Sequence, residues 1–263
     1  MAIAKLKNNL NMYYEIHGEG EPLILINGLK SDHTGWVPLL DSLRKHFQVI
    51  ILDNRAVGQT KDNGDFFTIE DMAFDIIQLM DMLTISSAHI AGHSMGGAVA
   101  QVIAHQYADR VKKVFLCNTF MKINEVPNKT FNDVLTLFRQ GSSREDIMDA
   151  ILPWVFSSSF NTPELRAQIH SFVAVDPFWQ SPEDYERQLH ALGSFDSSLW
   201  AKEITVPTVV VGSHEDRTAL PEESIALANS IAAAQLEMLD GGHASAIEQP
   251  AAFYKLFAKH LTV

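Results

Sequence analysis

The sequence predicts an α/β fold with a mostly parallel β-sheet. Short apolar runs of strand length alternate along the chain with amphipathic runs of helical spacing, which is the pattern of this fold class. The run 48–52 is almost uniformly apolar, as expected for a central parallel strand that is covered on both faces. The length of 263 residues and the hydrophobic content of 46% suit one globular α/β core.

Seven runs have the composition of β-strands. In chain order they are residues 12–17, 23–26, 48–52, 88–91, 111–116, 208–211 and 235–239. A capping-box pattern, with Thr68 as N-cap and Asp71 as the third helical residue, predicts the start of a helix whose apolar residues continue to Leu83. Further helices are predicted over residues 98–107, 221–231 and 250–260.

The alternation of strands stops between residues 120 and 200. This segment is rich in aromatic residues, and we interpret it as a helical cap, or lid, inserted into a core formed by residues 1–119 and 201–263. Aromatic packing inside the cap is the favoured role of each ring. The candidates for covering an apolar pocket are Trp154, Phe178 and Trp179.

Charge and composition exclude several classes of function. The net charge of −12 disfavours nucleic-acid binding, because no basic stripe is present to neutralise phosphates. No membrane span and no signal peptide are predicted, since long apolar runs are absent. The single cysteine, Cys117, follows an apolar run, so we expect a buried, unreactive thiol and a cytoplasmic location. No oligomeric state is predicted.

The stretch Gly92-His93-Ser94-Met95-Gly96-Gly97 contains the pattern G-x-S-x-G between a strand-like and a helical run. This spacing predicts a sharp turn that exposes the Ser94 hydroxyl above the sheet, while the side chain of His93 points away from it. An ordinary serine in a glycine-rich loop is the alternative. A serine nucleophile also requires a base, an acid that orients the base, and donors for an oxyanion.

The base and the acid are predicted at the ends of later strands. Asp216 follows the strand 208–211, at the edge where catalytic loops gather in α/β sheets. His243 follows the last strand and a Gly-Gly turn, and it is selected from eleven histidines on that ground. The competing residues are His214 for the base, and Glu215 and Asp240 for the acid. The run 214–216 could also suggest metal ligands, but no further ligand completes a usual site, so no metal is expected.

The oxyanion requires two fixed N–H donors. Met95 supplies one, as the residue after the nucleophile, and Leu29 supplies the other from the loop that follows the strand 23–26. Lys30 and His33 lie in the same loop. A solvated charge is the favoured interpretation of each, and contact with a substrate carboxylate is the alternative.

Taken together, these residues resemble the α/β-hydrolase superfamily, and most closely its lid-bearing carboxylesterases and 3-oxoadipate enol-lactonases. The matching pieces are residues 26–29 with Trp36, 53–60, 92–97, Gly212 with Asp216 and Pro221, and 241–243 with Glu248 and Pro250. The resemblance implies an eight-stranded sheet, a helical cap and no cofactor.

Three positions bear on the resemblance. Asn27 stands where the family usually has histidine, and its side chain can still hold the oxyanion loop by hydrogen bonds. Ala56 stands where glycine is usual and restricts the backbone there. The nucleophile Ser94 is a serine rather than an aspartate, which disfavours haloalkane dehalogenase and Asp-dependent epoxide hydrolase chemistry.

The sequence therefore predicts a cofactor-free serine hydrolase that cleaves a small or medium carboxylic ester through an acyl-enzyme. The alternative within the fold is an enol-lactonase or a C–C bond hydrolase acting on an anionic ring-cleavage product, which needs a pocket cation. The candidate cations are Lys30, Arg139, Arg166 and Arg187. An acyl-carrier-protein thioesterase is disfavoured because both proteins are acidic. A hydrolase-fold ligand receptor or inactive scaffold is the alternative of another class.

Overall fold

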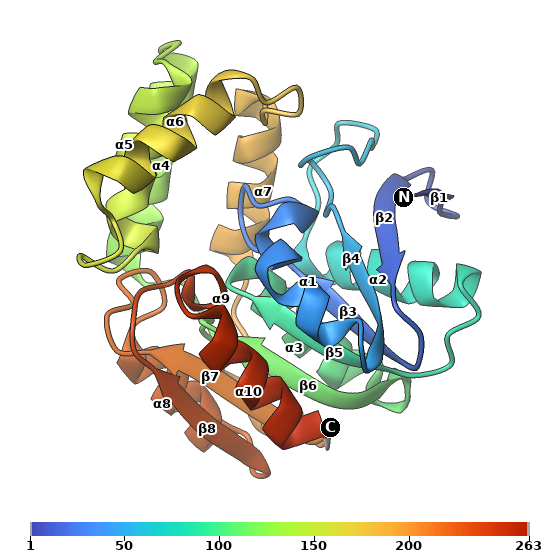
Figure 1. Cartoon of the computed structure of the whole chain (residues 1–263). Helices are drawn as coiled ribbons and strands as arrows, with labels where there is room; N and C mark the ends of the chain where they lie inside the picture. The colour runs from blue at the N-terminus through green and yellow to red at the C-terminus, as the bar shows by residue number, and fades with distance from the viewer. Residues whose placement is uncertain (1, 262–263) are drawn as a thin grey trace.

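The strands of the protein form one mixed sheet (Figure 1). The computed structural model describes residues 2–261. The strands are β1 (Ala2–Lys5), β2 (Asn11–His17), β3 (Glu21–Ile26), β4 (Phe47–Leu52), β5 (Ala88–His93), β6 (Val111–Cys117), β7 (Thr208–Ser213) and β8 (Ala234–Leu239). Their order is β1-β2-β4-β3-β5-β6-β7-β8. β2 pairs antiparallel with β1 and β4, and every pair from β4 to β8 is parallel, which confirms the predicted fold class and the eight-stranded sheet.

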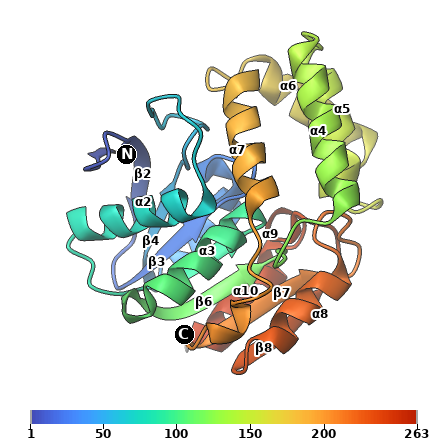
Figure 2. The same ribbon diagram turned by 180° about the vertical axis from the view of Figure 1, so that it is seen from behind.

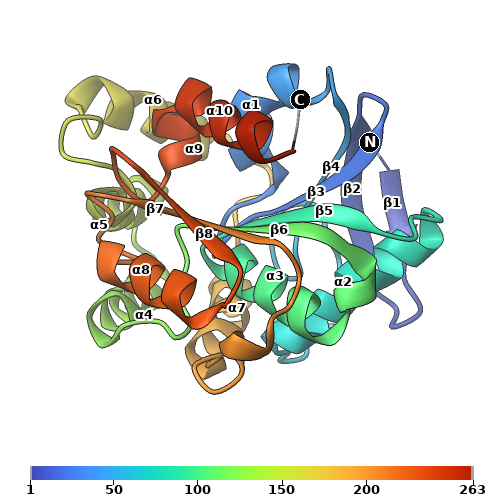
Figure 3. The ribbon, with the colours of Figure 1, turned by 90° about the horizontal axis from the view of Figure 1, so that it is seen from below.

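Helices cover both faces of the sheet (Figure 3). On one side lie α1 (Val37–Leu43), α9 (Ser245–Glu248) and α10 (Pro250–Leu261), and on the other lie α2 (Ile69–Met82), α3 (Met95–Gln106) and α8 (Pro221–Ser230). Successive residues of a strand point to opposite faces, so Leu25 joins the cluster under α1 and α10 while Ile24 joins the one under α2 and α3. Both faces need apolar residues, which explains the uniformly apolar central strands.

Four helices between β6 and β7 form a separate group, which we call the helical insert. They are α4 (Glu125–Arg139), α5 (Arg144–Val155), α6 (Pro163–Ala174) and α7 (Pro182–Ser194). Figures 1 and 2 show them standing together to one side of the sheet. The two ends of this segment meet where Ser197 N donates to Met121 O at 2.8 Å. The chain then passes through the short 3₁₀ turn Ala201–Glu203 into β7.

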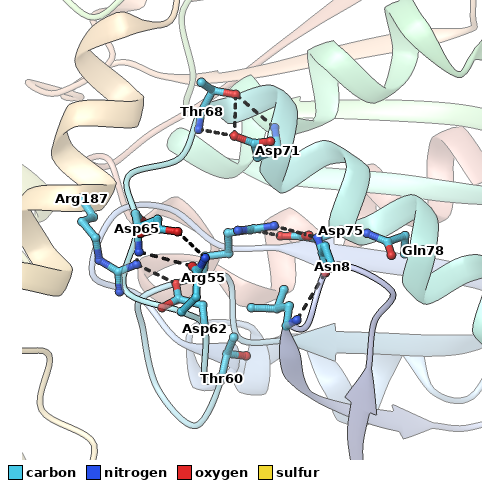
Figure 4. A network of polar contacts seen from close by, with 12 residues as sticks. Asn8, Arg55, Thr60, Asp62, Asp65, Thr68, Asp71, Asp75, Gln78 and Arg187 are labelled. Carbon is cyan, nitrogen blue, oxygen red and sulfur yellow. Dashed lines mark hydrogen bonds and ion pairs between the residues drawn. The ribbon is translucent and has the colours of Figure 1, made fainter.

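A polar network joins α7 of the helical insert to the loop after β4 (Figure 4). Arg187 Nη1 donates to Asp62 Oδ2 at 2.9 Å and to Asp65 O at 3.0 Å, and its side chain is only 7% exposed. In the same network, Arg55 pairs with the buried Asp75 of α2. Breaking a buried pair leaves an uncompensated charge, so this network fixes the insert relative to the loop.

Most of the elements predicted from the sequence are present. Each predicted strand corresponds to an observed one, with ends that differ by two residues or fewer, and the capping box of Thr68 and Asp71 is present at the start of α2. The strand β1 and the helix α1 were not predicted. β1 has only four residues, most of them exposed, and α1 follows the 3₁₀ turn His33–Trp36 with only seven residues, so neither has a clear hydrophobic period. No helix in the described part of the chain is long and apolar enough to span a bilayer.

Candidate active site

Ser94 lies at the turn between β5 and α3 in a backbone conformation that side chains rarely adopt, with φ +56° and ψ −120°. Two glycines make this turn sterically feasible. A Cβ on Gly92 would lie 2.0 Å from Gly96 O, and a Cβ on Gly96 would lie 2.3 Å from Ile26 O. The strained backbone conformation therefore lies at Ser94, the serine of the G-x-S-x-G motif, as is common at functional sites.

We expect Gly96→Ala to lower the free energy of unfolding by about 3 kcal/mol, at the upper end of the usual cost of overpacking, because the clashing Ile26 O belongs to a central strand that cannot move aside. Gly193→Ala is the matched control. A Cβ on Gly193, in α7, would meet only Asn128 Oδ1 at 3.8 Å, so this change should stabilise by up to about 1 kcal/mol. Urea unfolding measures both, and a Gly96→Ala protein as stable as the wild type would contradict the described turn.

Asp216 and His243 form a buried hydrogen-bonded pair. Asp216 follows β7 and His243 follows β8, and His243 Nδ1 lies 3.0 Å from Asp216 Oδ1 and 2.9 Å from Oδ2. The structure thus brings together two residues that are far apart in the sequence. The competing residues His214, Glu215 and Asp240 are all exposed.

The surroundings of Asp216 favour its ionised form. Burial opposes ionisation, but the charge and hydrogen bond of His243, together with other donors, outweigh burial and hold the pKa of Asp216 below its ordinary value. These donors are Asn118 Nδ2 at 3.0 Å, Thr218 N at 2.8 Å and Ala219 N at 2.9 Å. An ionised Asp216 accepts from Nδ1–H of His243, which leaves Nε2 of that ring free to accept a proton.

His93 has a role that sequence reasoning missed. Its Nε2 donates to the carbonyl oxygen of His243 at 2.8 Å, and the two ring centroids lie 4.7 Å apart. Burial, and secondarily the charge of His243, lower the pKa of His93 to about 4. His93 is therefore neutral at neutral pH and holds the backbone of His243 in place. This role depends on a contact with His243, which lies 150 residues further along the chain, so the local motif around Ser94 could not indicate it.

The Glu248 carboxylate supports the His243 loop from another direction. It accepts from Gly242 N at 3.1 Å and from Ser157 N at 2.9 Å, and it also accepts from the Ser157 hydroxyl at 2.6 Å. Ser157 lies two residues after the end of α5, so this carboxylate ties the His243 loop to the base of the helical insert. Ala244 N adds a bond to Val155 O at 2.9 Å.

Ser94 and His243 line the same cavity. Within residues 2–261, the hydrogen bonds do not include one between the Ser94 hydroxyl and His243. Catalytic hydrogen bonds of free enzymes are often long, and they shorten when a substrate is bound. The structure thus brings Ser94 and His243 to one cavity, where a substrate could contact both.

Two backbone amides lie beside Ser94 with no acceptor. Leu29 N and Met95 N donate to no other group in the described part of the chain. Gly28 brings the first loop against the serine, since a Cβ there would lie 2.9 Å from Ser94 Cβ. Asn27 holds this loop as expected, because its Nδ2 donates to Asp32 O. The loop that contains Leu29 N therefore lies against Ser94, and Met95 N follows Ser94 directly.

Sequence reasoning also missed Gln188 of α7, which holds the loop that contains Leu29. Its side chain is completely buried, and its Oε1 accepts from Lys30 N at 3.0 Å. Its Nε2 donates to Arg55 O at 2.7 Å. The side-chain amide thus links the helical insert to the residue next to Leu29, and a shift of Gln188 would move the Leu29 N–H donor.

We expect Gln188→Leu to lower kcat about 10- to 100-fold and to change KM much less, since a donor displaced by about 1 Å loses its contact in the transition state. Gln168→Leu, an exposed change on α6, is the control. A Gln188→Leu enzyme with unchanged kcat would show that this glutamine does not position the loop.

The cavity above Ser94 has a volume of about 300 Å³. Its apolar lining comes largely from the helical insert, with Met148, Ile151, Leu152 and Val155 forming one face of α5. Of the four candidate pocket residues, Lys30 and Trp179 line the cavity, so the favoured interpretation of Lys30 as a solvated charge was wrong. The predictions for Trp154 and Phe178 were wrong. Trp154 lies outside the helical stripe of α5 that faces the cavity, and Phe178 is 41% exposed in the loop between α6 and α7.

The described residues contain a group of three neighbouring side chains of metal-ligating type, Asp32, His33 and Asp53. Their polar atoms are occupied by local bonds. Asp53 Oδ1 accepts from His33 N at 2.8 Å and lies 2.7 Å from His33 Nδ1, while Asp53 Oδ2 accepts from Gln59 N at 2.7 Å. Asp32 accepts from Thr34 N at 2.9 Å. The group therefore braces the loops after β3 and β4, and of its three members only Asp32 lines the cavity.

Comparison with known proteins identifies the family of the chain. A family model described as the alpha/beta hydrolase fold matches residues 21–250. The chain belongs to the α/β-hydrolase fold family. This α/β-hydrolase superposes on the crystal structure of an enol-lactonase from Burkholderia xenovorans with a TM-score of 0.89 and 31% identity, over 99% of this chain and 100% of the other.

Two further proteins are similar to this α/β-hydrolase over nearly its whole length. A thermophilic esterase from Thermogutta terrifontis has a TM-score of 0.87 and 26% identity, with 100% of this chain and 98% of the other covered. A protein of Stutzerimonas stutzeri named "Putative carbamate hydrolase RutD" is 27% identical over 261 residues, which cover 95% of this chain and 96% of the relative.

Proposed function

We propose that this α/β-hydrolase is a cofactor-free serine hydrolase that cleaves small or medium carboxylic esters, including lactones, through an acyl-enzyme. One observation carries the proposal. Ser94, on its strained turn, shares a cavity with His243, whose ring forms a buried hydrogen-bonded pair with Asp216. These three residues are the proposed triad, with Ser94 as nucleophile, His243 as base and Asp216 as the acid that orients it.

The reaction follows from these roles. Ser94 Oγ attacks the carbonyl carbon as His243 Nε2 takes its proton, and the N–H groups of Leu29 and Met95 bind the resulting oxyanion. The intermediate collapses and expels the alcohol, which receives the proton from His243. Water, deprotonated by His243, then attacks the acyl-enzyme, and a second oxyanion forms at the same two donors. Its collapse returns the proton to Ser94 and releases the acid.

The helical insert acts in this proposal as the lid of the site, with residues 1–119 and 201–263 as the core and 120–200 as the cap. Its apolar residues line the cavity and would exclude water from the acyl-enzyme. The enol-lactonase and the esterase among the similar structures support ester bonds as the substrate class. Cys117 is a free, buried cysteine, and its burial raises the pKa of the thiol. A free, unreactive thiol is compatible with a cytoplasmic location.

The test is a panel of 4-nitrophenyl esters of increasing acyl length measured beside an enol-lactone and a carbamate. The proposal expects hydrolysis of esters or the lactone at about 1 per second or faster. Faster cleavage of the carbamate than of every ester and lactone would replace the proposed substrate class. Turnover below about one per minute with every compound would favour the hydrolase-fold receptor or scaffold instead.

A further inference from the structure

A single lysine lies in the otherwise largely apolar cavity. Among the described residues that line it, Lys30 is the only lysine or arginine. Its ammonium nitrogen lies 3.3 Å from the centroid of the Trp179 ring and 5.8 Å from that of Phe138. Such contacts stabilise a desolvated cation but satisfy none of its N–H donors.

The Lys30 ammonium has no acceptor among residues 2–261. It forms no hydrogen bond there, and no carboxylate lies within 4.0 Å of it. Two acids line the same cavity and favour the charged form of Lys30 through space, but each accepts a nearby backbone N–H and neither bonds to the ammonium. Asp32 accepts from Thr34 N at 2.9 Å, and Asp176 accepts from Phe178 N at 2.8 Å. Burial lowers the pKa of Lys30 to about 7, as expected for an ammonium without a close counter-ion.

The other predicted candidate cations are engaged outside the cavity. Arg139 pairs with Glu186 at 2.7 Å, Arg187 pairs with Asp62 at 2.9 Å, and Arg166 Nε donates to Asn161 Oδ1 at 2.9 Å. None of the three lines the cavity. Arg144 also lies near the Trp179 ring, at 5.3 Å from its centroid, but it donates to Val173 O and Asp176 O and does not line the cavity. If the substrate carries a negative charge, Lys30 is the cation among the described lining residues that can meet it.

The geometry points to Lys30, seated on Trp179, as a binding residue for a carboxylate carried by the substrate. The inference rests on the proposed function and narrows its substrate class to esters or lactones with a free carboxylate. Lys30 follows Leu29, whose N–H would bind the oxyanion, and its own side chain leaves the loop toward the rings of the insert. The carboxylate therefore lies on a carbon chain that extends from the reacting carbonyl toward Trp179.

A matched pair of substrates tests this inference. One is 4-nitrophenyl hexanoate, and the other is the mono-4-nitrophenyl ester of adipic acid, in which a carboxylate replaces the terminal methyl group. The wild-type enzyme should have a higher kcat/KM for the acid ester. Lys30→Met should lower the ratio of kcat/KM for the acid ester to that for the neutral ester about 10- to 100-fold, as expected for the loss of one charged hydrogen-bond partner. Lys30→Arg should restore part of the ratio.

Arg139→Met, which removes an exposed cation of the insert, is the control and should leave the ratio unchanged. A wild-type preference for the neutral ester, or an unchanged ratio in Lys30→Met, would overturn the inference while leaving the proposed function intact. The wild-type preference is informative even if Lys30→Met fails to fold. If the wild type hydrolysed neither of the two esters nor an enol-lactone measured beside them, that result would instead count against the proposed function.

Discussion

Ser94→Ala should lower kcat for the best ester by about 10⁴- to 10⁶-fold, because no acyl-enzyme can form without the hydroxyl. The protein should remain folded, since alanine removes one oxygen and the strained turn is held by Gly92 and Gly96. Release of 4-nitrophenol measures the loss, and circular dichroism checks the fold.

Ser194→Ala is the matched control for that experiment. Ser194 is an exposed serine at the end of α7, and its hydroxyl only donates to His190 O at 2.8 Å. This variant should retain wild-type turnover. Activity of Ser94→Ala within a few-fold of wild type would remove Ser94 from the role of nucleophile.

Asp216→Asn should lower kcat about 10⁴-fold with much less effect on the binding of substrate. Asparagine is nearly isosteric, but it carries no charge to stabilise the imidazolium of His243. Its NH₂ group also presents a donor where Asp216 accepts from Asn118, Thr218 and Ala219. The expected consequence is a His243 ring in the wrong tautomer or orientation.

Measurement of kcat and KM for Asp216→Asn checks this expectation, with Asp240→Asn as its control. Asp240 is the exposed acid that competed for the same role in the sequence. If Asp240→Asn were the variant with the larger loss of kcat, the assignment of the acid would be wrong.

The elements of the sheet could be predicted because both faces are covered, so each central strand is a short apolar run that stands out from its surroundings. The positions of Ser94, Asp216 and His243 follow from the same regularity. Each residue comes after a parallel strand, and parallel strands bring such loops to one edge of the sheet. Ser94 could therefore be grouped with Asp216 and His243, although more than a hundred residues separate it from each of them.

The contacts that determine the pocket could not be predicted in this way. The role of Lys30 depends on where Trp179 of the insert lies, and that of Gln188 depends on how α7 meets the loop of Leu29. The prediction for Trp154 was wrong because the rotation of α5 about its own axis decides which of its side chains face the cavity. Composition indicates that a helix is present, but packing against other helices sets its rotation.

Reaction with a fluorophosphonate, followed by peptide mass mapping, tests the central claim most directly. The proposed triad predicts one phosphonyl group on the peptide that contains Ser94, formed in step with the loss of ester turnover, and no labelling of Ser94→Ala. Full turnover by protein already labelled at Ser94, or inactivation with the label on another residue, would contradict the account.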